Sequence, residues 1–147
     1  PLHFFSIARG APQLGLGREK VYNLPDDQFV QRLNELYNAI PREIANDQEM
    51  LELYLPPLRA DLEIYETYEL IDRTPLQVPL TAISGIDDPL INTFGLQAWS
   101  ELTTQNFAAR QFAGGHFCMQ GQELEVLAYF RTRLSETNAP RVGGALD

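Results

Sequence analysis

Lysine and cysteine each occur only once in this sequence of 147 residues. Eleven basic side chains stand against twenty acidic ones, so the formal net charge is −9 at pH 7. Binding to nucleic acid needs clustered Lys and Arg that displace counterions from phosphates, so this class is excluded, and binding to an anionic membrane is disfavoured for the same reason. The lone Cys118 allows no internal disulfide. No apolar run approaches the roughly 20 residues of a membrane-spanning helix, and we expect a cytoplasmic protein.

Metal-binding and phosphate-binding motifs are absent as well. The two histidines, His3 and His116, stand far apart and form no helical His pair, so the sequence implies neither a metal nor another cofactor. Gly15-Leu16-Gly17 lacks the Gly-Lys-Ser/Thr ending of a phosphate loop. The sequence opens at Pro1, without Met and directly before an apolar run, and we expect it to be a piece of a longer protein.

The residues that are present suffice for one folded domain with an unevenly distributed charge. Apolar residues make up 44% of the chain, which is enough for one core but not for two domains. Between Glu19 and Asp72 there are 13 acids and 4 bases, while the remainder holds 7 of each. The whole net charge therefore lies in one acidic block.

Three apolar runs predict the strands of an α/β fold. Residues 2–8 and 79–85 are nearly continuously apolar, which is typical of strands buried on both faces. Residues 107–113 alternate more and predict a peripheral strand. A helix predicted between the second and third runs implies a right-handed crossover that makes these two strands parallel neighbours.

The other apolar residues recur at helical spacing. In the acidic block they predict one helix from Pro25 to Pro41, a second from Asp47 that Pro56-Pro57 breaks, and a third after it. Further on, they predict a helix that opens at Asp87-Asp88-Pro89 and an amphipathic helix over residues 122–135. We expect residues 138–147 to form a flexible tail.

A carboxylate and an imidazole follow the second and third predicted strands. Asp88 and His116 are 28 positions apart, but the crossover brings their loops to the same edge of the sheet. A carboxylate that accepts from one imidazole nitrogen fixes the tautomer, and the other nitrogen can then take a proton from a hydroxyl. An ordinary helix cap at Asp87-Asp88-Pro89 and a structural histidine are the alternatives. We assign Asp87 as the cap and Asp88 as the partner of His116, although the sequence leaves this division open.

Several segments, in this order and spacing, resemble the type II thioesterases that accompany nonribosomal peptide and polyketide synthases. The resemblance covers residues 1–134. It is carried by Phe5-Ser6-Ile7-Ala8-Arg9-Gly10-Ala11-Pro12, Leu24-Pro25-Asp26, Leu55-Pro56-Pro57-Leu58-Arg59-Ala60-Asp61, Ile83-Ser84-Gly85-Ile86-Asp87-Asp88-Pro89 and Phe112-Ala113-Gly114-Gly115-His116-Phe117.

The resemblance implies an α/β-hydrolase fold with a mostly parallel sheet, formed here by residues 1–137, with a helical lid inserted at about residues 20–70. It implies hydrolysis of acyl thioesters on the phosphopantetheine arm of an acyl or peptidyl carrier protein, which clears misprimed or stalled synthases. It carries the acid of the catalytic triad onto Asp88 and the base onto His116. It implies no cofactor.

The sequence departs from the family at the nucleophile. The motif Gly-x-Ser-x-Gly should precede the first strand, and no such pattern occurs. The serines that are present fall in predicted strands or helices and not on a strand-to-helix turn: Ser6, Ser84, Ser100 and Ser135. We therefore interpret the chain as the carboxyl half of a thioesterase that is inactive alone and pairs with its amino half. Cys118 is interpreted as a small buried apolar residue.

Two other functions remain open from the sequence. One is a noncatalytic, truncated hydrolase module that binds a carrier protein or a synthase, and the other is an α/β-hydrolase that acts on small esters. Carrier proteins are typically acidic, so the acidic block should repel them. We expect docking near Arg9 or Arg18 instead.

Overall fold

The computed structural model describes residues 3–17 and 19–138, which divide into two compact units. The sheet unit comprises residues 3–9 and 74–138, and the helical unit comprises residues 10–73 without residue 18. The predicted tail lies outside the described residues except for Asn138, which ends the last helix. In residues 3–17 and 19–138, no helix combines the length and apolar character needed to cross a membrane.

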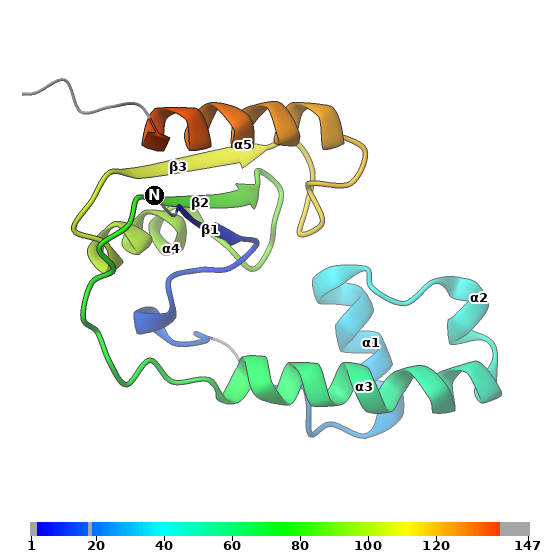
Figure 1. The fold of residues 1–147 in the computed structure, drawn as a ribbon. Coiled ribbons are helices and arrows are strands. Elements are labelled where there is room, and N and C mark those ends of the chain that lie inside the picture. Colours follow the sequence, from blue (N-terminus) through cyan, green and yellow to red (C-terminus); the bar gives the residue numbers. More distant parts are fainter. Residues whose placement is uncertain (1–2, 18, 139–147) are drawn as a thin grey trace, which may run out of the picture. The chain divides into compact units, whose positions relative to one another are not determined.

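Three parallel strands form the sheet in the order β1-β2-β3. β1 spans Phe4–Ile7, β2 spans Leu80–Gly85 and β3 spans Phe107–Phe112, each inside a run that the sequence predicted as a strand. Leu80 pairs with Phe4 on one side and with Phe107 on the other. All six residues of the central strand β2 are buried. Helix α5, Glu123–Asn138, lies over one face of the sheet, and α4, Thr93–Gln97, lies on the other (Figure 1).

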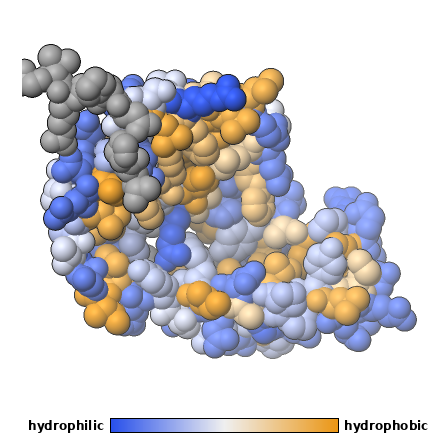
Figure 2. All heavy atoms as spheres, in the orientation of Figure 1, coloured by the Kyte–Doolittle hydropathy of each residue, from blue (hydrophilic) through white to orange (hydrophobic). Residues whose placement is uncertain are grey.

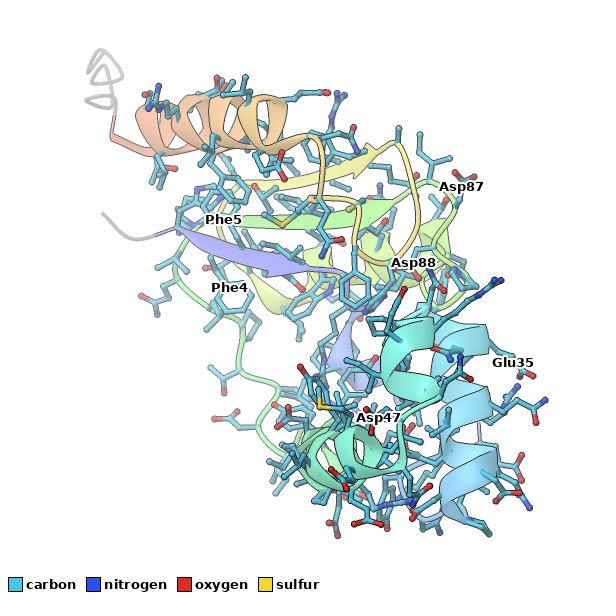
Figure 3. The ribbon with its side chains drawn as sticks, turned by 90° about the vertical axis from the view of Figure 1, so that its right-hand side faces the viewer. Phe4, Phe5, Glu35, Asp47, Asp87 and Asp88 are labelled. Carbon is cyan, nitrogen blue, oxygen red and sulfur yellow. The ribbon has the colours of Figure 1, made fainter. Side chains whose placement is uncertain are left out.

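The prediction that β1 is buried on both faces was wrong. Phe4 and Ile7 are 38% and 37% exposed, because β1 is an edge strand with a partner on one side only within the described residues. Phe4 and Phe5 point to opposite faces of the sheet (Figure 3). The Phe4 ring lies 5.7 Å from that of Trp99, and the Phe5 ring lies 4.7 Å from that of Phe130.

The helix between β2 and β3 begins later than predicted. It starts at Thr93 and not at Asp87, because Asn92 is the residue that caps it: the Asn92 side-chain oxygen accepts from the Gly95 N–H at 2.8 Å. A 3₁₀ helix, Ala98–Leu102, continues the crossover. The assignment of Asp87 as the cap of this helix was therefore wrong.

The helical unit contains most of the acidic block. After a short 3₁₀ helix at Pro12–Leu14, α1 spans Asp26–Tyr37, α2 spans Arg42–Ala45 and α3 spans Gln48–Thr67. Its buried core consists of Val21, Phe29, Leu33, Ile40 and Leu55. Of the three predicted helices, the first is present, although it ends at Tyr37, whereas the second and third are joined.

The prediction that Pro56-Pro57 breaks the helix was wrong, since α3 runs continuously through both prolines. Each proline removes one backbone hydrogen bond, to the carbonyl four residues earlier. Here these carbonyls belong to Glu52 and Leu53, which are exposed, so water can replace the lost donors. The buried Leu55 and half-buried Leu58 continue the apolar stripe across the prolines. Packing thus outweighs the local preference.

Two charged side chains fasten the chain before α1 to helix α3. The buried Glu66 carboxylate accepts from the Val21 N–H at 2.7 Å. The Arg59 guanidinium donates to the Leu24 carbonyl at 2.8 Å and lies 4.2 Å above the centre of the Phe29 ring. These contacts give Arg59 of the Leu-Arg-Ala-Asp segment a structural role within the helical unit.

His3, directly before β1, contacts both β2 and α5 at the amino end of the sheet. His3 Nδ1 lies 2.8 Å from Thr137 Oγ1, and Nε2 lies 2.9 Å from the buried Thr81 Oγ1. Burial lowers the pKa of His3, and the positive charge of Arg133 lowers it further, while Glu136 acts in the opposite direction. The folded chain therefore favours the neutral imidazole.

The lowered pKa of His3 predicts that the stability of the folded chain depends on pH. Because the folded state binds the His3 proton less well than the unfolded state, the free energy of unfolding should fall as the pH drops below about 6.5. Urea unfolding between pH 7.5 and 5 measures this decline. His3→Gln should flatten it, whereas His116→Gln, which changes the only other histidine, should retain the His3 contribution. An equal decline in His3→Gln and in the unchanged chain would contradict the prediction.

Candidate active site

Asp88 and His116 meet beyond the carboxyl ends of β2 and β3. His116 Nδ1 lies 3.0 Å from Asp88 Oδ2, across the 28 positions that separate them in sequence. The Asp88 side chain is 0% exposed and that of His116 is 16% exposed. Asp87 and Asp88 both follow the end of β2 (Figure 3), but only Asp88 is buried. The structure thus brings together the two residues that the sequence analysis singled out.

Backbone contacts hold the two loops against each other. The Ile86 N–H donates to the Phe112 carbonyl at 2.9 Å, and the Asp87 N–H donates to the Gly114 carbonyl at 3.0 Å. Gly85 makes this approach possible, because a Cβ there would lie 2.1 Å from the carbonyl oxygen of Gly115 and 2.2 Å from that of Gly114. This requirement could not be predicted from the sequence, since a glycine that ends a strand carries no sign of what approaches it.

The second oxygen of Asp88 also has a donor. Asp88 Oδ1 accepts from the Leu90 N–H at 2.9 Å, so that both carboxylate oxygens are hydrogen-bonded and the side chain is oriented. With Asp88 as acceptor, the neutral His116 ring carries its proton on Nδ1 and its lone pair on Nε2. Nε2 can then take a proton from a hydroxyl group or a water molecule, and Asp88 can stabilise the imidazolium that forms.

Cys118 is close to the pair in sequence but does not form part of it. It is 3% exposed and packs with Ile83, Phe112 and Val126 in the core of the sheet unit. Burial raises the pKa of its thiol, and the negative charge of Asp88 raises it further. A buried, protonated thiol is a poor nucleophile, which agrees with its interpretation as an apolar core residue.

The structure places the serines within regular elements. Ser6 lies in β1, Ser84 in β2, Ser100 in the 3₁₀ helix at Ala98–Leu102 and Ser135 in α5. Within residues 3–17 and 19–138, therefore, no serine occupies a sharp turn between a strand and a helix. No group of three His, Cys, Asp or Glu side chains suited to a metal ion occurs in that part of the chain either.

Comparison with known proteins matches this chain to one family. The model of the thioesterase domain matches residues 1–134. The gramicidin S biosynthesis protein GrsT of Aneurinibacillus migulanus is 32% identical over 142 residues, which cover 97% of this chain and 55% of that protein.

Two solved structures show the same similarity. The thioesterase RedJ from the prodiginine pathway of Streptomyces coelicolor is 30% identical with a TM-score of 0.76, over 88% of this chain and 51% of that one. The type II thioesterase BorB from the borrelidin biosynthetic cluster is also 30% identical with a TM-score of 0.76, over 90% and 54% of the two chains. The chain thus spans about half the length of the relatives that it matches.

Proposed function

The chain belongs to the thioesterase family of α/β-hydrolase fold, and we propose that it supplies the acid and the base of a Ser-His-Asp hydrolase that cleaves acyl groups from the phosphopantetheine arm of carrier proteins. The observation that carries the proposal is the pair formed by His116 and the fully buried Asp88 at 3.0 Å. The proposed biological role is to clear misprimed or stalled nonribosomal peptide and polyketide synthases.

The proposed reaction has two rounds. A serine oxygen attacks the thioester carbonyl while its proton passes to His116 Nε2, and His116 then gives this proton to the departing thiol of the carrier. Water attacks the resulting acyl-serine, again through His116, and releases a carboxylic acid and the free serine. Asp88 holds the imidazole in the reactive tautomer throughout. The serine is proposed to belong to an amino-terminal half, because the sequence contains no Gly-x-Ser-x-Gly.

The free edge of β1 supports such a partner segment. The Phe4 N–H donates to the carbonyl of Pro79, directly before β2, and the Ala8 N–H donates to the carbonyl of Ile83 in β2. The alternate residues, Phe5 and Ile7, therefore direct their backbone groups away from β2. No strand among residues 3–17 and 19–138 occupies that side. Hydrophobic side chains gather there below α5 (Figure 2). An apolar, unpaired edge is typical of a strand that pairs with another, and the amino half is its proposed occupant.

The acidic helical unit is proposed as the lid, and its charge disfavours it as the docking surface for an acidic carrier protein. Among the predicted docking residues, Arg9 belongs to the sheet unit, and Arg18 lies outside the described residues. Docking near Arg9 and a cytoplasmic location both stay predictions.

Joining the chain to its amino half tests the proposed function. The 147 residues would be expressed together with the sequence that precedes Pro1 in the reading frame, and hydrolysis of an acylated carrier protein would be compared with hydrolysis of p-nitrophenyl acetate. We expect the joined protein to cleave the thioester and the 147 residues alone to leave it intact, because the attacking serine is missing.

Other outcomes would identify the alternatives. Faster cleavage of the simple ester than of the acylated carrier protein would indicate an esterase. Absence of both activities, together with measurable binding of the carrier protein, would indicate a noncatalytic module. The simplest preliminary observation is whether the upstream reading frame encodes Gly-His-Ser-x-Gly.

A further inference from the structure

One side chain ties both ends of the loop that carries His116. The Gln122 Nε2 group donates to the Ala113 carbonyl at 2.7 Å and to the Cys118 carbonyl at 2.8 Å. Ala113 directly follows β3, and Cys118 comes two residues after His116. A primary amide has two N–H bonds, and here each N–H bond has its own carbonyl acceptor. The loop is therefore closed by a single amide group.

Gln122 is itself anchored at the start of α5. Its backbone carbonyl accepts from the Val126 N–H at 3.0 Å, and Val126 is 2% exposed in the core of the sheet unit. The Gln122 side chain reaches back from this anchored position across the loop. It thus connects the His116 loop to α5, the helix that lies over one face of the sheet (Figure 1).

The loop needs such a tie because its backbone is permissive. Gly114 has a φ of +97°, and a second glycine, Gly115, precedes His116. Two glycines in succession give the unconstrained chain many conformations, most of which move the imidazole away from Asp88. Fixing both ends of the loop removes much of this freedom before any substrate binds.

We propose that Gln122 is a positioning residue, which holds the loop at Ala113 and Cys118 so that His116 Nδ1 stays within hydrogen-bonding distance of Asp88. The role that Gln122 supports is the one proposed for His116, so this inference rests on the proposed function. Glutamate has the same length but no N–H groups, and leucine has a similar volume but no polar atoms. Neither can replace both hydrogen bonds.

Two measurements test the proposal with Gln122→Leu and Gln122→Glu. In the 147-residue chain, NMR follows the proton between His116 Nδ1 and Asp88, whose resonance should disappear or exchange much faster in both variants. In the joined protein, kcat should fall about 10- to 100-fold while KM changes less than twofold, because a small displacement of the base affects the reaction step more than substrate binding.

Gln120→Leu is the matched control, since Gln120 lies in the turn directly before Gln122 and has an exposed side chain. It should retain both the resonance and kcat. Circular dichroism reports whether each variant is folded. If Gln122→Leu does not fold, the resonance and kcat of Gln122→Glu, whose side chain has the same length as that of Gln122, decide the test.

An unchanged His116 resonance and kcat in the folded variants would overturn the positioning role. If instead the resonance is lost in the variants while the unchanged joined protein hydrolyses no thioester, the proposed function fails and the positioning of His116 stands.

Discussion

Replacing His116 by alanine is expected to lower kcat for the acylated carrier protein by about a thousandfold in the protein joined to its amino half. The reason is that general base catalysis contributes on the order of 10²- to 10⁴-fold. His116 is the proposed base for the serine, and the buried Asp88 carboxylate orients it, with Nδ1 and Oδ2 3.0 Å apart. Steady-state hydrolysis with a thiol-trapping reagent measures the loss. KM should change little, because the imidazole acts in the reaction step.

Substitution of the two adjacent aspartates separates the acid from its neighbour. Asp88→Asn should approach the loss of His116→Ala, because an amide can donate to Nδ1 and select the wrong tautomer. Asp87→Asn is the matched control, since Asp87 is exposed, and it should leave kcat within about twofold of the unchanged protein. Equal losses in the two variants, or full activity in His116→Ala, would refute the assigned roles.

Gly85→Ala should both destabilise the protein and lower its activity. The new Cβ would lie 2.1 and 2.2 Å from two backbone carbonyl oxygens. This clash can be relieved only by a movement of the backbone. Overpacking of this kind costs about 1–3 kcal/mol, and a backbone clash belongs to the upper end of that range. This movement would separate the loop of Asp88 from the loop of His116, so kcat should also fall, by about tenfold or more. Thermal unfolding and the hydrolysis assay measure the two effects.

Gly115→Ala is the control for that substitution. A Cβ on Gly115 meets only the Asp87 carbonyl oxygen, at 3.9 Å, which is an ordinary contact, although both glycines belong to the same loop crossing. Its midpoint of thermal unfolding should therefore stay close to that of the unchanged chain. If the two variants were equally stable, the close approach would not explain why position 85 is glycine.

The strands and the Asp88–His116 pairing could be predicted from the sequence because both depend on simple regularities. Continuous apolar runs mark the buried parallel strand β2, and the geometry of a crossover places the ends of adjacent strands side by side. The helix-start pattern alone, however, left the division between Asp87 and Asp88 open, and it was the family resemblance that carried the acid onto Asp88. That division follows from burial: Asp88 turns inward and receives the Leu90 N–H, whereas Asp87 stays exposed.

The parts of the fold that the sequence did not predict depend on packing or on individual side-chain contacts. Pro56-Pro57 is a local stop signal, but α3 continues because its apolar face packs on both sides of the prolines. Asp87-Asp88-Pro89 resembles a helix start, but Asn92 caps the helix. The Gln122 side chain binds two individual carbonyls, nine and four positions earlier in the sequence, and single contacts of this kind leave no periodicity in a sequence.

In the sequence, the helical unit is inserted between Phe4 and Leu80, which pair in the sheet. The entropic cost of closing a chain between two such residues grows only with the logarithm of its length, so that doubling the segment costs about 0.6 kcal/mol. The helical unit also has its own buried core. Natural selection can therefore lengthen, shorten or reshape this insertion at little thermodynamic cost to the strands that carry the reactive residues.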